Sequence, residues 1–422
     1  MEASTIELDR VLERLDITEA RPKLEADWEA SQSVAPEGVP FFLEPAFVAR
    51  ACEGAYIPQQ FRPDLLRAAE RIAADEAARA LAWHAHWCMF ASGEVNRGRI
   101  RAWPRLTHSL GPEGGLLYLL AVLSGIEGMQ RIHAEHDIPE PVVADTMSQI
   151  ALYLRMTAQK QGYPEVIPHL AGWLMNHLTG NIYRLARLQF QFGRSHYRIR
   201  VFRDDASGQV VALSEPGVRF RPDGQVLRDG DEPAGSWEAV LVMEDAAVTG
   251  NPILPQGRAL AETVTLPRER WRAVFGPGTA VLHLHIPGGE PMHYDQCGAA
   301  FERALEFFPR HFPDYQFHAF TCGSWILDTA LQQIMPETSN LVRFQREVYL
   351  FPIGMPDDSL ARAIFDEWPI DLASAPRDTS MRRAYLDAMA SGGLPHGGGG
   401  CFLLPEDVRW GEQVYLSQEW PW

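Results

Sequence analysis

A change in residue pattern near residue 180 is the feature that most constrains the fold. Before it, apolar residues recur at helical spacing. After it, short runs of β-branched and aromatic residues alternate with turn signals such as Asp223-Gly224 and Ser207-Gly208. We therefore expect an α+β protein, with an all-helical domain over 1–180 and a mixed-sheet domain over 181–422.

The pattern also places the individual elements, with prolines and glycines as breakers. The sequence predicts one helix over 1–30 and further helices over 45–53, 63–91, 113–134, 140–160 and 164–179. It predicts strands at 183–192, 196–203, 209–213, 218–221, 237–244, 263–266, 281–286, 317–326 and 348–353. In the C-terminal segment the sequence predicts helices at 358–367 and 378–391 and a strand at 401–404. This segment either completes the sheet or forms a lid, and the run Gly397–Gly400 would allow a lid to move.

Composition limits the class of protein. The 422 residues, 46% hydrophobic and 22% charged, are enough for two globular domains. The net charge of −17 argues against a broad nucleic-acid surface. Five widely spaced cysteines without a CxxC pair suggest neither a disulfide framework nor a zinc site, and no other metal-ligand spacing stands out. Without a signal peptide or an apolar run of about 18 residues, we expect a cytoplasmic protein that does not enter a membrane.

The segment Ala280–Phe308 reads as a buried strand, a Gly/Pro loop and an amphipathic helix. A glycine-rich turn before a helix directs backbone N–H groups at a phosphate or carboxylate. An ordinary strand-to-helix connection explains the same residues, and Asp295 is a plausible N-cap that would occupy the anion site.

Four motifs carry a resemblance to a known family. They are Arg184-Leu185-Ala186-Arg187-Leu188-Gln189-Phe190, His285-Ile286-Pro287-Gly288-Gly289, Ser324-Trp325-Ile326-Leu327-Asp328, and Ser339-Asn340-Leu341 with Phe344. With the order of elements, they make the chain resemble a bacterial family of two-domain acyltransferase-like proteins, which have a helical N-terminal acyltransferase domain and a GNAT-like C-terminal domain.

The resemblance implies transfer of an acyl group from a thioester, usually acyl-coenzyme A, to an amine of a small-molecule acceptor. One departure concerns the donor: the Q/R-x-x-G-x-G/A run of GNAT pyrophosphate loops is replaced by Pro287-Gly288-Gly289-Glu290-Pro291, whose prolines donate no N–H. A carrier protein or an aminoacyl-tRNA therefore stays open as the donor. A binding protein that kept the fold without the chemistry is a further alternative.

Acyl transfer to an amine needs a base for the ammonium proton and often an acid for the leaving thiolate. His283 and His285 project from one face of the central strand, and either suits the base; His285 is favoured because it belongs to the family-like motif. Glu244, at the end of an earlier strand, is another base or acceptor contact, or simply a turn residue. Cys322 suits a nucleophile, an acid or an inert core thiol, and Tyr294 suits an acid.

The remaining candidates concern the donor. The central loop would hold its phosphates through Ile286, Pro287, Gly288 and Gly289, and Ser324 and Asn340 would contact it, although Ser339-Asn340 reads first as a helix N-cap. A tRNA donor would need a basic surface. The candidates are Arg184, Arg187, Arg194, Arg198, Arg200 and Arg203, which acidic neighbours would otherwise pair.

Overall fold

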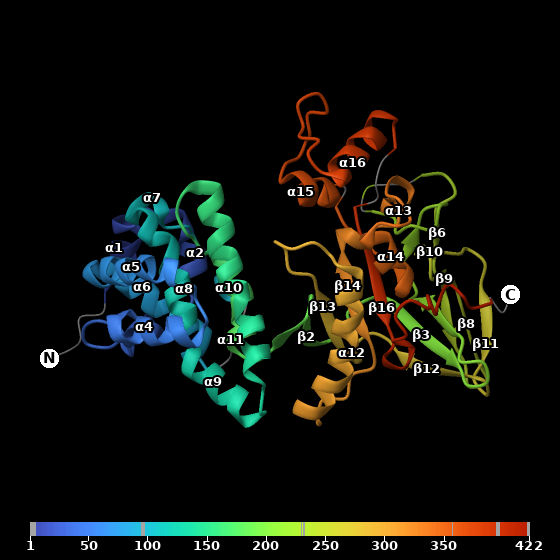
Figure 1. Cartoon of the computed structure of the whole chain (residues 1–422), viewed down its shortest axis with the longest axis horizontal. Helices are drawn as coiled ribbons and strands as arrows, with labels where there is room; N and C mark the ends of the chain where they lie inside the picture. Colours follow the sequence, from blue (N-terminus) through green and yellow to red (C-terminus); the bar gives the residue numbers. More distant parts are fainter. Residues whose placement is uncertain are drawn as a thin grey trace. The chain divides into compact units, whose positions relative to one another are not determined.

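The computed structural model describes residues 6–93, 98–228, 230, 233–356, 358–393 and 397–419. The chain divides into two compact units, which are described separately (Figure 1). Unit 1 comprises Met1–Leu185 together with Pro287–Glu290, and unit 2 comprises Ala186–Ile286 together with Pro291–Trp422. None of the described helices combines the length and the apolarity needed to span a bilayer.

Unit 1 is helical, as the sequence predicts. Its α-helices are α1 (Leu8–Arg14), α2 (Arg21–Leu24), α3 (Trp28–Ser33), α4 (Pro45–Gly54), α5 (Arg62–Ala74), α6 (Glu76–His86), α7 (Thr107–Leu110), α8 (Leu117–Leu123), α9 (Ile126–Glu135), α10 (Glu140–Gln161) and α11 (Pro168–Leu178). Short turns of helix lie between them: η1 (Thr18–Ala20), η2 (Phe41–Leu43), η3 (Gln59–Phe61), η4 (Trp87–Ala91), η5 (Arg99–Ala102) and η6 (Pro112–Leu116). Strand β1 (Ile182–Leu185) ends the first segment of the unit.

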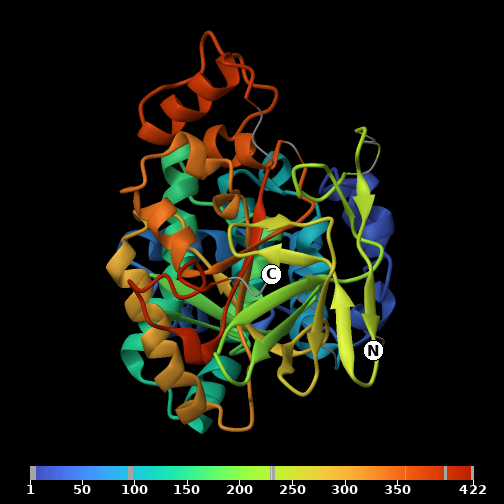
Figure 2. The same cartoon turned by 90° about the vertical axis from the view of Figure 1, so that its right-hand side faces the viewer.

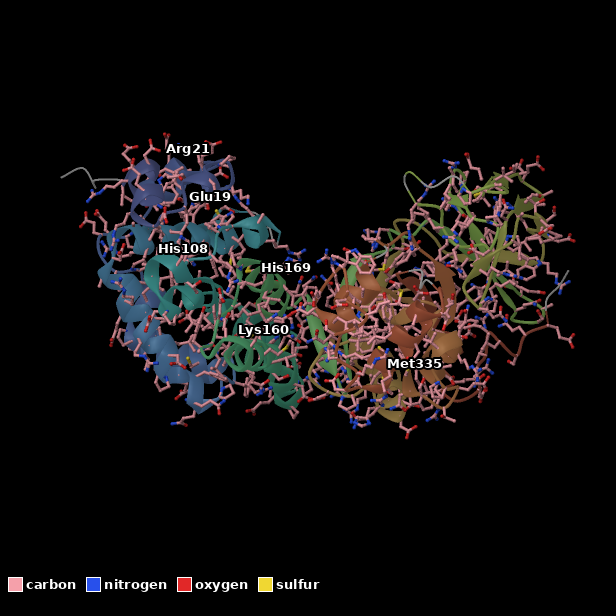
Figure 3. The ribbon with its side chains drawn as sticks, turned by 90° about the horizontal axis from the view of Figure 1, so that it is seen from above. Glu19, Arg21, His108, Lys160, His169 and Met335 are labelled. Carbon is pink, nitrogen blue, oxygen red and sulfur yellow. The ribbon has the colours of Figure 1, made fainter. Side chains whose placement is uncertain are left out.

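Helix α8 is the centre of unit 1. Every residue of Leu117–Leu123 is buried, and the helix packs against α4, α5, α6 and α11. A helix that is apolar on all sides has to lie inside its domain. His108 lies at the surface of this unit (Figure 3). Its Nε2 lies 3.0 Å from the Asp16 carbonyl oxygen, which connects α7 to the turn after α1.

Several predicted helices are divided where the backbone requires it. The N-terminal helix breaks at Asp16 and Asp27, whose φ angles are +53° and +62°. The predicted helix 63–91 ends at Asp75, whose carboxylate accepts from the N–H groups of Ala77 and Ala78 and so caps α6 instead. Most of the described residues of each segment are still helical, so the predicted fold class holds while these boundaries were wrong.

Unit 2 contains the strands. They are β2 (Leu188–Arg194), β3 (Ile199–Asp204), β4 (Val210–Ser214), β5 (Arg219–Phe220), β6 (Trp237–Glu238), β7 (Leu241–Met243), β8 (Ala247–Gly250), β9 (Pro252–Leu254), β10 (Arg258–Ala259), β11 (Val264–Pro267), β12 (Trp271–Phe275), β13 (Ala280–His285), β14 (Phe320–Ser324), β15 (Tyr349–Pro352) and β16 (Gly399–Leu403). The helices are α12 (Tyr294–His311), α13 (Leu331–Ile334), α14 (Asn340–Glu347), α15 (Ser359–Phe365) and α16 (Ser380–Ala390), with short turns η7 (Trp325–Leu327) and η8 (Pro405–Asp407). The prediction missed β8, β9, β10 and β12.

The main sheet of unit 2 has the strand order β2-β13-β14-β16-β15. Strands β13 and β14 are parallel, and the other neighbours are antiparallel, so the sheet is mixed as predicted. Helix α12 joins β13 to β14 and covers one face of the sheet (Figure 1). On this face Phe301 and Phe308 pack on Phe190.

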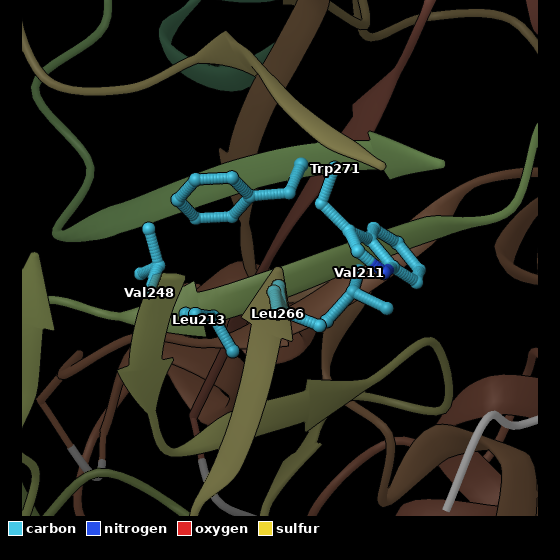
Figure 4. Packing of buried hydrophobic residues seen from close by; sticks show 6 residues of the cluster. Val211, Leu213, Val248, Leu266 and Trp271 are labelled. Atoms are coloured by element: carbon cyan, nitrogen blue, oxygen red, sulfur yellow. The ribbon is translucent and has the colours of Figure 1, made fainter. Parts of the chain in front are cut away.

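A second sheet, β10-β9-β4-β3-β12, packs against a smaller one, β11-β8-β7. Figure 2 turns these green and yellow strands toward the viewer. Their shared core consists of Phe202, Val211, Leu213, Val248, Leu266 and Trp271 (Figure 4). Burying each of these side chains contributes about 1.5–3 kcal/mol, which holds the small sheet in place.

The tail completes the main sheet, because β16 lies between β14 and β15. Gly399 and Gly400, the second half of the glycine run, therefore belong to this strand. A Cβ on Gly399 would lie 2.2 Å from the Leu327 carbonyl oxygen, and one on Gly400 would lie 2.2 Å from Phe351 Cε2. These two glycines let the strand approach its neighbours closely. From the sequence alone, the same residues had been interpreted as a flexible segment.

Candidate active site

Strands β13 and β14 pair over a short stretch and then part. Leu282 pairs with Phe320 and His283 with Thr321, and no further pair joins these two fully described strands. Beyond that point β13 continues to His285 alongside β2, and β14 continues to Ser324 alongside β16. The facing edges of the two strands thus leave the sheet ladder at His283 and Thr321, where an extended ligand can lie between them.

The register decides which side chains lie on each face of this sheet. Leu282 and Leu284 pair with Phe192 and Phe190 on the face covered by α12. The opposite face, here called the histidine face, carries the polar side chains near the point of divergence. It contains Gln189, Gln191, Gly193, His283, His285 and Thr321.

His283 is held at both ring nitrogens. Its Nε2 lies 3.3 Å from the Arg194 carbonyl oxygen, and its Nδ1 lies 3.0 Å from Thr321 Oγ1. A carbonyl only accepts, so the neutral ring carries its hydrogen on Nε2 and its lone pair on Nδ1. Burial, and secondly the neighbouring His196, lower the pKa of His283, so its neutral form is present near pH 7.

Gly193 is required where the His283 ring crosses β2. A Cβ at Gly193 would lie 2.4 Å from His283 Cδ2, so any larger residue would displace the imidazole. The strand motif Leu188–Arg194 therefore provides space for the ring as well as backbone pairing.

His285 lies two residues further along the same face. Its Nε2 lies 2.8 Å from Gln191 Oε1, an acceptor, which places the hydrogen on Nε2 and the lone pair on Nδ1. Burial, and secondly His283, lower the pKa of His285 to about 4. At neutral pH this ring is uncharged and a weak base.

A pocket of about 470 Å³ lies in unit 2 next to His283. His196 and Tyr197 line it, and their rings lie 5.4 and 6.5 Å from the His283 ring between centroids. Phe351, also in the lining, packs edge-on against Tyr197 at 5.1 Å. The volume is within the range of small-molecule sites, and two of the lining rings lie near the His283 ring.

Cys322 and Ser324 share a face, which is the face toward α12. Cys322 follows Thr321 on β14 and therefore points away from the histidine face. Burial raises the pKa of its thiol to about 12, so the thiol is protonated at neutral pH. Ser324 Oγ accepts from the Ile326 N–H at 3.5 Å and caps η7.

Tyr294 and Asn340 lie around α14. The Tyr294 hydroxyl donates to Glu347 Oε1 at 2.5 Å, while Glu347 Oε2 accepts from the Gly411 N–H at 2.9 Å. This network joins α12, α14 and the C-terminal segment, and burial raises the pKa of Tyr294 well above its usual value. Asn340 begins α14, which Ser339 caps through the Val342 N–H, as the sequence indicated.

Glu244 is not brought to the histidines. It follows β7 in the small third sheet, its side chain is exposed, and its N–H donates to the Ala247 carbonyl in the turn to β8. This placement agrees with the turn interpretation.

The central loop is divided between the units. Ile286 belongs to unit 2, and Pro287–Glu290 belongs to unit 1. Gly289 has φ +82°, and a Cβ there would lie 2.5 Å from Leu152 Cδ1 on α10, whereas Gly288 is exposed with nothing near its Cβ position. Asp295 lies inside the first turn of α12, not at its N-cap, which is His293.

The basic cluster is held by partners within the chain. Arg184 pairs with Glu290, Arg200 with Glu215 and Arg203 with Asp407. Carbonyl oxygens accept from the other three, Arg187, Arg194 and Arg198. These contacts account for the arginines without a nucleic-acid ligand. Among the described residues, no group of three His, Cys, Asp or Glu side chains is arranged to hold a metal ion.

Sequence reasoning missed Gln191, Thr321, His196 and Tyr197. Gln191 could have been noticed, because the run Gln189-Phe190-Gln191-Phe192 alternates and so puts both glutamines on one face. Their pairing with the histidines depends on a register between segments about 90 residues apart, which no local pattern contains.

Two family models match the sequence. The N-acyltransferase N-terminal domain matches residues 46–180, and the GNAT-like C-terminal domain matches residues 182–402. Fold and matches together define the class of protein, a two-domain acyltransferase. The chain belongs to the family with the GNAT-like C-terminal domain, which spans more than half of it, and the resemblance seen in the sequence is confirmed.

Solved acyltransferase structures share this fold. One is in complex with decanoyl-CoA and teicoplanin; it is 19% identical, with a TM-score of 0.62. Another, a mutant in complex with octanoyl-CoA, is also 19% identical, with a TM-score of 0.63. Each alignment covers 94% of this chain and 99% of the other chain. No curated protein matches the chain.

Proposed function

We propose that the protein is an N-acyltransferase that moves an acyl group from acyl-CoA to an amine of a small-molecule acceptor. The observation that carries the proposal is the parting of β13 and β14 beside His283 and Thr321. The acyl-CoA complexes of the structural neighbours support the donor, and the teicoplanin complex supports a small-molecule acceptor.

In this proposal the donor thioester lies along the separated edges of the strands. The Leu282 N–H donates to the Ala319 carbonyl toward β14. Backbone groups alternate along a strand, so the Leu284 N–H points to the same side, beyond the last pair. It is placed to donate to the oxyanion formed when the amine attacks the thioester carbonyl.

His283 serves as the base. The proton reaches Nδ1 through Thr321: its Oγ1 accepts the ammonium proton as it passes its own hydrogen to Nδ1, and it then accepts from the imidazolium that forms. The sequence favoured His285 as the base. We assign His283 instead, because its ring contacts His196 and Tyr197, which line the pocket. Collapse of the tetrahedral intermediate then breaks the C–S bond and releases CoA as the thiolate.

The other sequence candidates keep narrower roles. Cys322 is compatible with a thiol donor but not with a nucleophile, because its thiol stays protonated. Tyr294 is already bound to Glu347, so an acid role would require this network to open. The loop residues Ile286 to Gly289, with Ser324 and Asn340, stay predicted contacts of the donor.

The test is an assay of acyl transfer from decanoyl-CoA to a panel of amines. Release of CoA measures the rate, and mass spectrometry identifies the acylated product. We expect turnover by the full chain and a loss of kcat of about 100-fold or more in His283→Gln, since general-base catalysis contributes at least that factor. Equal turnover by wild type and His283→Gln contradicts the assigned base. Acyl-CoA binding without transfer to any amine favours a silent binding protein.

A further inference from the structure

We infer that the hydroxyl of Tyr197 donates a hydrogen bond to the carbonyl oxygen of the thioester, which becomes the oxyanion when the amine attacks. The inference rests on the proposed function, because it adds a catalytic residue to that reaction. It follows from where the hydroxyl lies, from its lack of a partner in the chain and from its protonation state.

Gly323 lies on β14 just beyond the point where β13 and β14 part. The Leu282 N–H donates to the Ala319 carbonyl, and backbone groups alternate along a strand. Every second residue of β14 after Ala319 therefore presents its N–H and C=O toward β13. Thr321 is the last of these to pair with β13, and Gly323 is the next. Gly323 thus borders the gap in which the proposed donor lies, while β16 pairs with it on the other side.

The Tyr197 hydroxyl lies over Gly323. A Cβ on Gly323 would lie 2.9 Å from Tyr197 Oη and 3.4 Å from Cε1 of the same ring, so the glycine gives the hydroxyl room at this edge. Side chains alternate between the faces of a strand, so this Cβ position is on the face of Thr321, the histidine face. The Tyr197 ring accordingly lies 6.5 Å from the His283 ring between centroids. The hydroxyl and the assigned base therefore lie on the same face of the sheet, beside the gap.

The hydroxyl makes no hydrogen bond with another residue of the described chain, although Tyr197 is only 9% exposed. A buried hydroxyl is normally paired, because the loss of its water without a replacement costs stability. Tyr197 also lines the pocket of about 470 Å³, so a bound molecule can reach it. A ligand oxygen at the gap would supply the acceptor that the chain does not.

Burial decides what the hydroxyl can do. It raises the pKa of Tyr197 well above its usual value, so the phenol keeps its proton at neutral pH and acts as a donor. Such a weak acid is a poor proton source for a leaving thiolate, because a thiol has a pKa of about 8.5. It can still stabilise negative charge that develops on a carbonyl oxygen.

Tyr197 neither gains nor loses a proton in this step. As the amine nitrogen bonds to the carbonyl carbon, the π electrons move to the carbonyl oxygen, and the O–H···O bond from Tyr197 strengthens. When the C–S bond breaks, the carbonyl re-forms and that hydrogen bond weakens again. The stabilisation is therefore greatest in the tetrahedral intermediate, as catalysis requires.

Tyr197→Phe removes the hydroxyl and keeps the ring. Infrared difference spectra of the full chain are recorded with decanoyl-CoA carrying carbon-13 at its carbonyl. The C=O stretching frequency should be lower in wild type than in the variant, because a hydrogen bond weakens the double bond. With the most reactive amine of the panel, kcat should fall about 100-fold, as for loss of one oxyanion donor, while the KM of decanoyl-CoA changes less than about threefold. Tyr163→Phe, in unit 1 and outside the pocket lining, is the matched control and should change neither quantity.

Gly323→Ala tests the position of the hydroxyl without removing it. The added methyl group would lie 2.9 Å from Oη and displace it, so the variant should raise the carbonyl frequency and lower kcat as Tyr197→Phe does. Both substitutions act on one hydroxyl, so the double variant should lose no more than about threefold in kcat beyond Tyr197→Phe alone. Losses that multiply in the double variant contradict the assigned position. This variant also gives the infrared readout if Tyr197→Phe does not fold.

The outcomes separate this inference from the proposed function. Equal carbonyl frequencies in wild type and in Tyr197→Phe, with equal Tm and bound decanoyl-CoA, overturn the hydrogen bond, whatever the rates. A lower frequency in wild type, without transfer to any amine, supports the hydrogen bond and contradicts the proposed reaction instead. If decanoyl-CoA does not bind to the wild type, the acyl-CoA donor of the proposed function is contradicted.

Discussion

At the scale of residues, the site depends on how two histidines are held by their neighbours. Thr321 and the Arg194 carbonyl fix the His283 ring, and Gln191 holds His285. In each case the acceptor oxygen sets the tautomer, so the lone pair faces away from that oxygen on Nδ1. These contacts define the protonation states on which the chemistry depends.

The lowered pKa of His283 predicts the pH dependence of acyl transfer. Because the base must be neutral, kcat/KM should fall as the pH drops through the pKa of His283, which burial places below the usual 6.5. A pH profile with decanoyl-CoA checks this. Thr321→Val should move the inflection and lower kcat, while Thr321→Ser, which keeps the hydroxyl, should restore both. An inflection that is unchanged in Thr321→Val contradicts the positioning role.

The contact between Gln191 and His285 predicts that a charge placed at position 191 shifts the pKa of His285. In Gln191→Glu a carboxylate replaces the amide 2.8 Å from Nε2, so it should raise the pKa of His285 from about 4 by one unit or more. Nitrogen-15 NMR of the labelled ring measures this. Gln191→Leu is the control, in which no upward shift is expected. A pKa of His285 that is equal in the Glu and Leu variants would show that the contact is absent in solution.

The sequence shows part of this arrangement. The spacing of His283 and His285 places them on one face, and the structure agrees. Their contacts depend on Gln191 in β2 and Thr321 in β14, which long-range pairing brings alongside. A local pattern gives the period of a strand but not its partners, so the contacts of each candidate could not be predicted.

At the scale of elements, glycines decide how closely strands and loops approach. The run Gly397–Gly400 looks like a flexible linker by composition, yet Gly399 and Gly400 are strand residues against Leu327 and Phe351. The short strands β8, β9, β10 and β12 were missed because two- to five-residue strands give little periodic signal.

Gly400→Val should destabilise unit 2. The added side chain meets the ring of Phe351 in the middle of the main sheet, and overpacking of this kind costs about 1–3 kcal/mol. Differential scanning calorimetry should show a lower Tm for the variant. Gly288→Ala, where no atom lies near the Cβ position, should leave the Tm unchanged. An unchanged Tm in Gly400→Val would mean that β16 is not packed as described.

The central loop gives a second prediction at this scale. Gly289→Leu is a poor probe of donor binding, because the side chain would collide with Leu152 whatever the ligand. Gly288→Leu adds bulk to an exposed position instead, so it should weaken binding of decanoyl-CoA about tenfold without changing the Tm if the loop contacts the donor phosphates. Unchanged affinity would remove the loop from the donor site.

At the scale of the whole molecule, the chain has two compact units with different chemistry. Unit 2 carries the histidine face and the pocket, while unit 1 is built around the apolar α8. Helical and strand periodicity predicted this fold class. The domain division expected between 180 and 181 stays a prediction, because the compact units divide after Leu185 and the loop Pro287–Glu290 returns to unit 1.

Buried histidines predict that the molecule loses stability in mild acid. Burial lowers the pKa of His84, His86 and His133 in unit 1 to about 4, against a usual value near 6.5. The unfolded chain then binds more protons between these values, so stability present above pH 6.5 is lost as the pH falls toward 4. Thermal unfolding measured from pH 7 to 4.5 should give a steadily falling Tm; a constant Tm would contradict the neutral buried state of these rings.

The central claim is that acyl-CoA is the donor, and calorimetric titration of the full chain tests it most directly. We predict micromolar binding of decanoyl-CoA, weaker binding of CoA alone, and retention of binding in His283→Gln, which should lose turnover but not the donor. Absence of binding by decanoyl-CoA, octanoyl-CoA and acetyl-CoA alike would contradict the account.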